Sequence, residues 1–542
     1  MTKFVTVGPP GSGKTQWCLK TVEGLIDAGV HPQQICLVTF TTVAAREIKD
    51  RLKATFPQYG YEDFQWVGTI HSLCRRLLGH PVDLLFAGKQ MLDFASAYHY
   101  SYNIVDPADE DLEIHEQMLV SDADWFDQFD NWTRNSLCPD FERGYSQFFS
   151  YFDLSYVPQR FTQGTLKLYL ERKRRYMADK GLLDFAGLIE KVIEGGQRPP
   201  VKYLIQDESQ DSSKLLWRVL YSWAKRCEQM ICVGDPDQAI YAGFLPADPE
   251  EFLRFAEGAS RLDLQNSHRL PRAVQRLSEA WISKNKQRLS RIFLPRNAEG
   301  KVETFCRLEH LPIDEWSMSQ DGQWSAFILS RTRRQATEHK QWLMDRGIPF
   351  ATNRGEENPL QTPKGRFAHA LLKLTGDESI DMQDLEGVMK WIPSKPWMTH
   401  GAKKKLEERI KSEPAAQVSW RDLPALGFSR EFVEPMMEDP GKNFLVPLKF
   451  SDVEKAYLRR VYNRFGKAAF VTTPKILASN IHGSKGMEAT NVVLNPDLTS
   501  YPARMMMTTP EEERRICYVG ITRAKEALHI LWPERDTHYR LW

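Results

Sequence analysis

A glycine-rich run with a lysine and a threonine lies at residues 8–15, directly after a short apolar stretch and before a segment with helical periodicity. Glycines allow backbone N–H groups to point at phosphate oxygens, and the start of a helix adds the positive end of its dipole. We expect Lys14 to contact the β- and γ-phosphates of a nucleoside triphosphate and the hydroxyl of Thr15 to bind Mg²⁺. The run that fits G-x-x-x-x-G-K-[ST] is Gly8, Pro9, Pro10, Gly11, Ser12, Gly13, Lys14 and Thr15.

Acidic and amide side chains follow two further apolar runs, where we expect strands to end. Asp207 and Glu208 come directly after residues 203–206, and Gln238 comes shortly after residues 230–234. Open parallel sheets bind ligands at the carboxyl ends of their strands. Asp207 can hold Mg²⁺ through water, and Glu208 can orient or deprotonate an attacking water. The amide of Gln238 would lie near the γ-phosphate and sense its presence.

The elements that must position these side chains alternate between strand and helix. We expect a strand at 4–7, a helix at 14–28, a strand at 35–39 and a helix at 42–56. This order is typical of a parallel sheet with crossover helices. The pattern stops after about residue 76 and returns with the strands 203–207 and 230–234, so a long insertion separates two parts of one sheet.

A second α/β unit is predicted to begin near Leu262 and is interrupted by another mainly helical insertion. Its expected strands lie at 325–329, 492–494 and 528–531. We therefore expect an α/β protein with two cores, each with a mainly helical inserted subdomain. The predicted domains are 1–79 with 196–261 (first core), 80–195 (its insertion), 262–357 with 467–542 (second core) and 358–466 (its insertion).

Composition narrows the class of protein. The 542 residues include 72 basic and 71 acidic side chains, so any contact with nucleic acid must depend on local patches. Eight scattered cysteines lack zinc-ligand spacing and suggest buried thiols in a reducing compartment. Met1 leads directly into the first strand, and no apolar run approaches the roughly 20 residues of a membrane span. We expect a soluble, cytoplasmic protein that does not contact a membrane.

These segments, in this order, resemble the UvrD/Rep group of superfamily 1 helicases over nearly the whole chain. The glycine-rich run and the Asp-Glu pair are two of the matching motifs. The matching segments are residues 39–45, 68–72, 207–211, 234–241, 265–269, 481–488 and 512–524. The last of these contains Tyr518-Val519-Gly520-Ile521-Thr522-Arg523-Ala524, which is nearly a family consensus.

The resemblance implies two RecA-like P-loop NTPase cores with ATP bound between them, and an ATP-dependent DNA helicase that moves 3′ to 5′ on single-stranded DNA. ATP and Mg²⁺ are the implied cofactors. Arg269 and Arg523 would reach the γ-phosphate and stabilise the charge of the transition state, beside the catalytic Asp207, Glu208 and Gln238. Glu488 would accept a hydrogen bond from the ribose.

The resemblance also implies a single-stranded DNA path across the top of both cores, with bases stacked on aromatic rings. Its partners would be single-stranded DNA, junctions with duplex DNA, and proteins of replication, repair or recombination in a bacterial or virus-infected cell. We expect a monomer or a weak dimer. The predicted DNA-binding residues are Thr39, Phe40, Thr69, His71, Tyr241, Phe244, Arg331 and His482.

The chain departs from the family pattern at three places. Only seven residues precede Gly8 and none is glutamine, so the adenine-contacting segment of the family has no counterpart and several nucleotides could be accepted. His268 stands where the family commonly has the tyrosine that stacks on the base. Tyr241 is followed by residues 242–245 without the usual tryptophan, and Phe244 could replace that ring one position along.

Two charged stretches of the first insertion admit two interpretations each. Residues 106–130 are acidic, and we expect a solvated face turned away from DNA, with a contact surface for a basic partner as the alternative. A basic helix at 167–180 could meet duplex phosphates or form a solvated face. Its basic residues include Lys167, Arg172, Lys173, Arg174 and Arg175.

Three other functions remain open from the sequence. The first is a single-stranded DNA translocase that displaces bound proteins and unwinds duplex weakly. The second is a small-molecule P-loop kinase, whose phosphate loop is similar but whose single compact domain fits this length poorly. The third is a DNA-binding subunit without hydrolysis, which the complete set of catalytic residue types disfavours.

Overall fold

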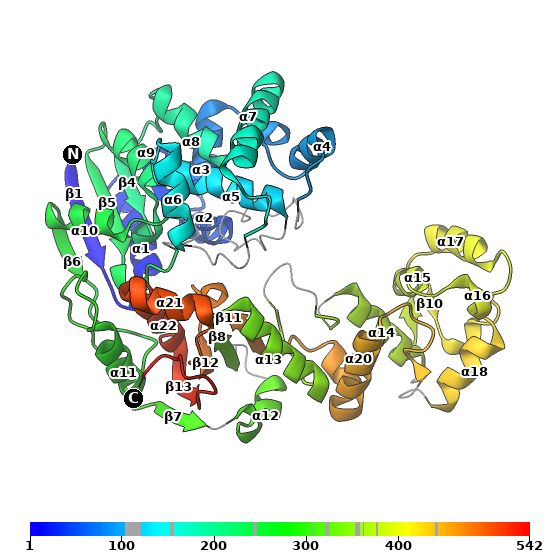
Figure 1. Cartoon of the computed structure of the whole chain (residues 1–542). Helices are drawn as coiled ribbons and strands as arrows, with labels where there is room; N and C mark the ends of the chain where they lie inside the picture. The colour runs from blue at the N-terminus through cyan, green and yellow to red at the C-terminus, as the bar shows by residue number, and fades with distance from the viewer. Residues whose placement is uncertain are drawn as a thin grey trace. The chain divides into compact units, whose positions relative to one another are not determined.

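The computed structural model describes residues 1–102, 121–151, 157–241, 246–305, 307–319, 325–352, 358–360, 362–375, 378–439 and 443–541 (Figure 1). The chain forms two compact units. The first unit comprises Met1–Lys301, Leu498–Glu526 and Thr537–Trp542, and the second comprises Val302–Asp497 and Ala527–Asp536. Among the described residues, no helix combines the length and the apolar character needed to cross a bilayer.

The first unit is built on a six-stranded sheet in the order β3-β2-β4-β5-β1-β6. Every neighbouring pair in it is parallel, so the carboxyl ends of all six strands lie at one edge. The loops that follow β1, β4 and β5 carry the glycine-rich run, the Asp207–Glu208 pair and Gln238 to this edge. The strands are β1 (Thr2–Val7), β2 (Ile35–Val38), β3 (Val67–Gly68), β4 (Tyr203–Gln206), β5 (Gln229–Gly234) and β6 (Ser260–Asp263).

Helices cover both faces of this sheet, as its strand sequences require. Ile35 and Leu37 of β2 join one hydrophobic core, whereas Cys36 and Val38 join another, because successive side chains of a strand point to opposite faces. The first core includes side chains from α1 (Lys14–Asp27) and α2 (Thr42–Thr55). The second core includes side chains from α3 (Ile70–Leu78), α8 (Phe185–Glu194), α9 (Lys214–Ala224) and α10 (Pro249–Glu257).

The described part of the first insertion is helical and has an aromatic core. Its helices are α4 (Lys89–Tyr98), α5 (Asp122–Asn135), α6 (Phe141–Tyr151) and α7 (Gln163–Lys180). Phe94, Phe129, Phe148 and Tyr169 are fully buried there, in contact with further rings at edge-to-face angles. The many Trp, Phe and Tyr residues of this segment therefore form its own core.

A few charged residues of this insertion form a buried ion network, which corrects the prediction of a solvated face for the end of the acidic stretch. Lys173, 5% exposed, pairs with Asp127 at 2.8 Å, Asp130 at 2.9 Å and Asp184 at 3.2 Å. Burial lowers the pKa of Lys173, but the three carboxylates outweigh burial and the net pKa lies above its ordinary value. Arg134 joins the network through Asp184 at 2.7 Å.

The acidic residues near the end of the stretch are therefore internal counter-ions, and Lys173 is not available to duplex phosphates. The remainder of the acidic stretch, residues 106–120, lies outside the described residues.

The second unit has a five-stranded sheet in the order β11-β8-β12-β13-β7. β8 pairs in parallel with both β11 and β12. The strands are β7 (Lys301–Phe305), β8 (Ala326–Ser330), β11 (Ile476–Asn480), β12 (Ala489–Leu494) and β13 (Ala524–Leu531). The fold is thus α/β with two RecA-like cores, as the sequence predicts.

Helices predominate in the insertion of the second unit, and they share a hydrophobic core with its sheet. A small antiparallel pair, β9 (Ile380–Asp381) with β10 (Gln417–Val418), lies among them. The helices are α14 (Pro363–Thr375), α15 (Met382–Lys390), α16 (Ser394–Trp397), α17 (Ala402–Ser412), α18 (Arg430–Glu438) and α20 (Asp452–Phe465). Helix α13 (Arg333–Arg346) precedes them.

The compact division of the chain does not follow the predicted domain boundaries. Leu262, where the sequence predicts a second α/β unit to begin, lies in β6 opposite Thr6 of β1. Helices α11 (Arg272–Ile282), α21 (Ser500–Thr508) and α22 (Pro510–Ile521) fall in the first unit. The division into four domains remains a prediction. The compact unit that contains the first sheet also contains α11, α21 and α22.

Candidate nucleotide site and DNA-facing edge

The glycine-rich loop connects β1 to α1 at the carboxyl edge of the first sheet. Gly11 and Gly13 have φ angles of 73° and 79°, in the left-handed region that glycine adopts without steric cost. Helix α1 begins at Lys14, and Gly13 caps it without a side-chain hydrogen bond. No N-cap side chain therefore bonds to the first-turn N–H groups of α1. Helix starts that bind anions need these N–H groups to point at the ligand.

The loop forms a tight cradle whose donors suit phosphate oxygens. An added Cβ at Gly8 would lie 2.2 Å from Ser12 Oγ, and one at Gly11 would lie 2.4 Å from Arg269 Cβ. The buried Ser12 hydroxyl has no hydrogen-bond partner among the described residues. Lys14 Nζ donates to the carbonyl oxygen of Gly8 at 3.1 Å. The backbone path, the orphaned hydroxyl and the buried ammonium therefore fit a bound polyphosphate.

The two predicted metal ligands are in direct contact, although they lie 192 residues apart in the chain. Thr15 Oγ1 donates to Asp207 Oδ2 at 2.6 Å, and the backbone N–H of Glu208 donates to Asp207 Oδ1 at 2.9 Å. Burial and the neighbouring Glu208 carboxylate raise the pKa of Asp207 to about 6. A hydroxyl and a carboxylate oxygen are ligands that Mg²⁺ accepts, so this donor set fits the metal.

Glu208 is held in an unusual backbone conformation by its neighbours. Its φ of 50° is left-handed, which for a residue with a Cβ costs about 1–3 kcal/mol and is typical of functional sites. Gln210 Nε2 donates to Glu208 Oε2 at 2.6 Å, while Gln210 Oε1 accepts from the backbone N–H of Asp235 at 3.0 Å. Gln210, for which the sequence predicts only membership of the matching segment 207–211, here orients the predicted general base.

The predicted sensor and one predicted arginine meet at the end of β5. Gln238 ends η5 (Pro236–Gln238), and its Nε2 donates to Asp235 Oδ2 at 2.8 Å. Gln238 Oε1 accepts from Arg523 Nη2 at 3.3 Å, across 285 residues of sequence. Arg523, 1% exposed, also donates from Nε to the carbonyl of Val519 on α22 at 3.0 Å.

Residues 267 and 268 are hydrogen-bonded to backbone carbonyl groups of the glycine-rich loop. The N–H of His268 donates to the carbonyl of Gly11 at 2.8 Å, and Ser267 Oγ donates to the carbonyl of Pro10 at 2.7 Å. The side chain of His268 is exposed. Arg269 Nη1 donates to the carbonyl of Thr522 at 3.3 Å, which links this segment to the residue before Arg523.

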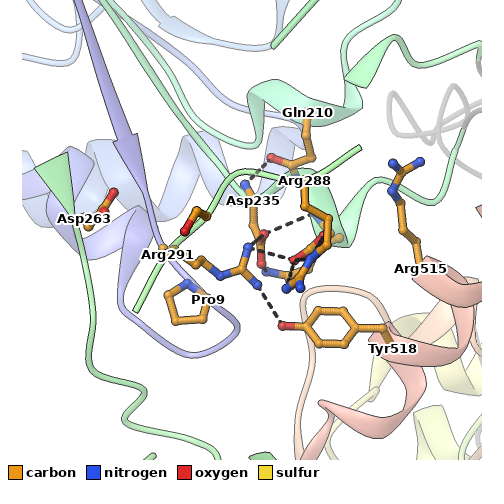
Figure 2. A network of polar contacts seen from close by, with 12 residues as sticks. Pro9, Gln210, Asp235, Asp263, Arg288, Arg291, Arg515 and Tyr518 are labelled. Carbon is orange, nitrogen blue, oxygen red and sulfur yellow. Dashed lines mark hydrogen bonds and ion pairs between the residues drawn. The ribbon is translucent and has the colours of Figure 1, made fainter. Parts of the chain in front are cut away.

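A second set of buried charges, which the sequence does not predict, adjoins this site (Figure 2). Arg291 pairs with Asp235 and, at 3.0 Å, with Asp237, and it donates to Tyr518 Oη at 3.0 Å. Arg288 pairs with Asp237 at 2.8 Å. The sequence indicates only that two carboxylates after a buried strand need cationic partners. The neighbouring residues do not identify which Lys or Arg side chains these partners are.

The predicted DNA-binding residues of the first unit follow the ends of β2, β3 and β5. The rings of Phe40 and Tyr241 stack on each other, with centroids 5.4 Å apart and an interplanar angle of 22°. The hydroxyl of Thr69 accepts from the N–H of Ser72 at 3.3 Å and caps α3. Thr39 Oγ1 donates to the carbonyl of Thr41 at 2.9 Å.

The rings of His71 and Phe185 form an edge-to-face contact, with their centroids 5.7 Å apart. Phe244, the predicted replacement for the missing tryptophan, lies outside the described residues. A DNA-binding role for all of these residues remains a prediction.

Three predicted site residues belong to the second unit. Arg331 follows β8 and His482 opens η9 (His482–Ser484) after β11, and these two parallel strands end opposite each other at Ser330 and Asn480. Arg331 and His482 therefore follow the same edge of that sheet. Glu488 directly precedes β12, beyond η9.

Comparisons with known proteins agree with this arrangement. The family model for the UvrD/REP helicase N-terminal domain matches residues 2–260, and that for the UvrD-like helicase C-terminal domain matches residues 456–535. The chain is similar to the probable DNA helicase II homolog of Rickettsia conorii, with 22% identity over 97% of this chain and 89% of that protein.

The chain is also similar to DNA helicase II of Haemophilus influenzae, with 23% identity over 98% of this chain and 82% of that protein. It is 22% identical to the ATP-dependent DNA helicase PcrA of Staphylococcus epidermidis, over 96% of this chain and 80% of that protein.

Proposed function

Because the chain belongs to the UvrD/Rep group of superfamily 1 DNA helicases, we propose that it uses ATP hydrolysis to move 3′ to 5′ along single-stranded DNA and to separate duplex DNA. The observation that carries the proposal is the meeting of Thr15 with Asp207 and of Gln238 with Arg523 in one compact unit. These contacts join a phosphate loop, a carboxylate pair, a polar sensor and a buried arginine. That combination suits phosphoryl transfer to water.

The geometry of the glycine-rich loop supports the proposed nucleotide binding. The N–H groups of residues 11–15 and the ammonium of Lys14 would hold the β- and γ-phosphates, and the exposed ring of His268 would stack on the base. Thr15 and Asp207 would hold Mg²⁺, which when bound neutralises charge on the phosphate oxygens. Glu488, from the second unit, would accept a hydrogen bond from the ribose.

The carboxylates and the arginines support the proposed hydrolysis. Glu208, oriented by Gln210, would take a proton from water while the water oxygen bonds to the γ-phosphorus and the bond to the ADP oxygen breaks. Arg269 and Arg523 would stabilise the charge that builds on the phosphoryl oxygens. Arginine suits this task because its charge is permanent and its planar fork matches phosphate.

Coupling to DNA would depend on the rings at the sheet edge. Phe40 and Tyr241 stack on each other, so a base would either stack on an outer face of this pair or replace the contact between the two rings. Stacking on aromatic rings contributes about 1–3 kcal/mol per base and does not depend on base identity. Bases could thus pass from ring to ring as nucleotide binds and leaves.

The first test is steady-state ATP hydrolysis with and without single-stranded DNA. We expect strong stimulation by DNA in the wild type, and a loss of about 100-fold or more in kcat for Lys14→Ala and Arg523→Ala. Lys20→Ala, an exposed lysine on the same helix as Lys14, is the matched control and should behave as the wild type. Hydrolysis that is indifferent to DNA would overturn the proposal.

Direction requires a separate measurement. Duplexes with a single-stranded tail at the 3′ or the 5′ end distinguish the two polarities, and we expect unwinding only with the 3′ tail. Displacement of streptavidin from biotinylated single strands without unwinding of either duplex would instead favour a translocase that clears bound proteins.

A further inference from the structure

Arg291 forms a buried link between the end of β5 and α22. Its side chain is 2% exposed and that of Asp235 is fully buried. One guanidinium nitrogen, Nη1, contacts carboxylate oxygens of Asp235 and Asp237, and the other, Nη2, donates to Tyr518 Oη at 3.0 Å. Figure 2 shows Arg291 between Asp235 and Tyr518. Arg291 itself lies between α11 and β7, more than 50 residues from Asp235 in the chain.

Asp235 is the point at which three parts of the catalytic site meet. Its Oδ2 accepts from Gln238 Nε2 at 2.8 Å, and its backbone N–H donates to Gln210 Oε1 at 3.0 Å. Gln210 in turn holds the carboxylate of Glu208. A shift of Asp235 would therefore disturb the predicted sensor and the predicted general base together.

The charge of Asp235 determines which way the amide of Gln238 points. An ionised carboxylate only accepts hydrogen bonds, so Gln238 must turn its NH₂ toward Asp235 and its oxygen toward Arg523. Burial raises the pKa of Asp235, and the Arg291 guanidinium opposes that rise. A protonated Asp235 could donate instead, and the amide could then reverse and lose its bond to Arg523.

We propose that Arg291 is a positioning residue for ATP hydrolysis, which acts through Asp235 to fix the orientation of Gln238 and Arg523. The effect of Arg291 passes through the Asp235 carboxylate, which contacts both Arg291 and Gln238. The inference rests on the proposed function, because a fixed sensor matters only if the γ-phosphate is hydrolysed at this site.

The test compares Arg291→Met, Arg291→Lys, Asp235→Asn and the double variant Asp235→Asn/Arg291→Met in DNA-stimulated ATP hydrolysis. We expect Arg291→Met to lower kcat by roughly 10- to 100-fold, as a small displacement of catalytic groups does. KM for ATP should change by less than about threefold, because the loop that binds the phosphates is intact. Lysine retains the charge, so Arg291→Lys should recover most of the lost kcat.

The double variant tests whether the effect passes through Asp235. Asparagine at position 235 needs no counter-charge and can still accept a bond from Gln238. We therefore expect the double variant to match Asp235→Asn in kcat within about twofold, whereas independent structural effects would multiply. Arg288→Met, which removes an arginine of the same segment that pairs with Asp237 and Glu279, should keep kcat within about threefold of the wild type.

Each result decides the inference. An unchanged kcat in Arg291→Met, a kcat as low in Arg291→Lys as in Arg291→Met, or a double variant more than tenfold below Asp235→Asn would overturn it. If Arg291→Met does not fold, as circular dichroism would show, Arg291→Lys against the wild type and the double variant against Asp235→Asn give the same decision. A wild type that DNA does not stimulate would contradict the proposed function instead.

Discussion

At the level of single residues, the glycine-rich loop requires glycine at position 11, where the chain passes close to residues 267–269. Gly11 has a left-handed φ of 73°, and an added Cβ would lie 2.4 Å from Arg269 Cβ and 3.0 Å from Ser267 Oγ. The N–H of His268 also bonds to the carbonyl of Gly11. The same position therefore sets the loop conformation and holds the segment that carries Arg269.

We expect Gly11→Ala to lower both stability and catalysis. The left-handed conformation alone costs about 1–2 kcal/mol with a Cβ, and relief of the clash must move residues 267–269 away from the loop. ATP turnover should fall by about tenfold or more, with a lower melting temperature.

The matched control for this change is Gly24→Ala, in the same helix that follows the loop. An added Cβ at Gly24 meets no atom within 4 Å. Alanine favours a helix interior by about 0.5–1 kcal/mol over glycine, so this variant should melt slightly higher and hydrolyse ATP normally. Equal behaviour of the two variants would show that position 11 has no special constraint.

At the level of elements, buried charges join three helices of the first insertion. Lys173 of α7 contacts Asp127 and Asp130 of α5 and Asp184, the N-cap of α8. Arg134 of α5 reaches Asp184 and Glu190 as well. Removing one partner from such a network leaves buried charge without compensation, which costs far more than the loss of an exposed ion pair.

We expect Lys173→Met to destabilise the insertion by about 3–5 kcal/mol, because three carboxylates then lose their central cation. Arg175→Met on the same helix removes an exposed pair with Glu171, whose side chains are 68% and 65% exposed, and should cost no more than about 0.5 kcal/mol. Urea unfolding followed by tryptophan fluorescence measures both. Similar costs for the two variants would show that the buried network does not hold the helices together.

At the level of the whole molecule, most of the predicted nucleotide-binding and catalytic residues belong to the first compact unit. The glycine-rich loop, Asp207, Glu208, Gln238, Arg269 and Arg523 all belong to it. Of the predicted nucleotide-binding residues, Glu488 belongs to the second unit. Ligand binding should therefore stabilise the two units to different extents.

A non-hydrolysable ATP analogue with Mg²⁺ should raise the unfolding temperature of the first unit more than that of the second. At a ligand concentration 100 times Kd, the stabilisation is about 2.7 kcal/mol for one site. Differential scanning calorimetry measures it, with Lys14→Ala as the variant that should show little shift. Equal shifts of all transitions in the wild type would contradict a site confined mainly to the first unit.

The sequence by itself determined the α/β class, and it predicted a nucleotide role for the glycine-rich loop and a catalytic role for Asp207 and Glu208. These features are local: a strand, a turn and a helix follow one another within a few residues, and parallel strands bring their carboxyl ends to one edge. The contact of Thr15 with Asp207 follows from that rule, although it spans 192 residues. The contact of Gln238 with Arg523 does not, because Arg523 directly precedes β13, a strand of the other sheet.

Only the tertiary structure decided which charges compensate one another. Lys173 belongs to a stretch that resembles a solvated basic helix, yet it is buried among carboxylates of two other helices. Arg291 meets Asp235 and Tyr518 across separations of 56 and 227 residues. Composition and periodicity describe one segment at a time, whereas the partner of a buried charge depends on how segments far apart in the chain pack together.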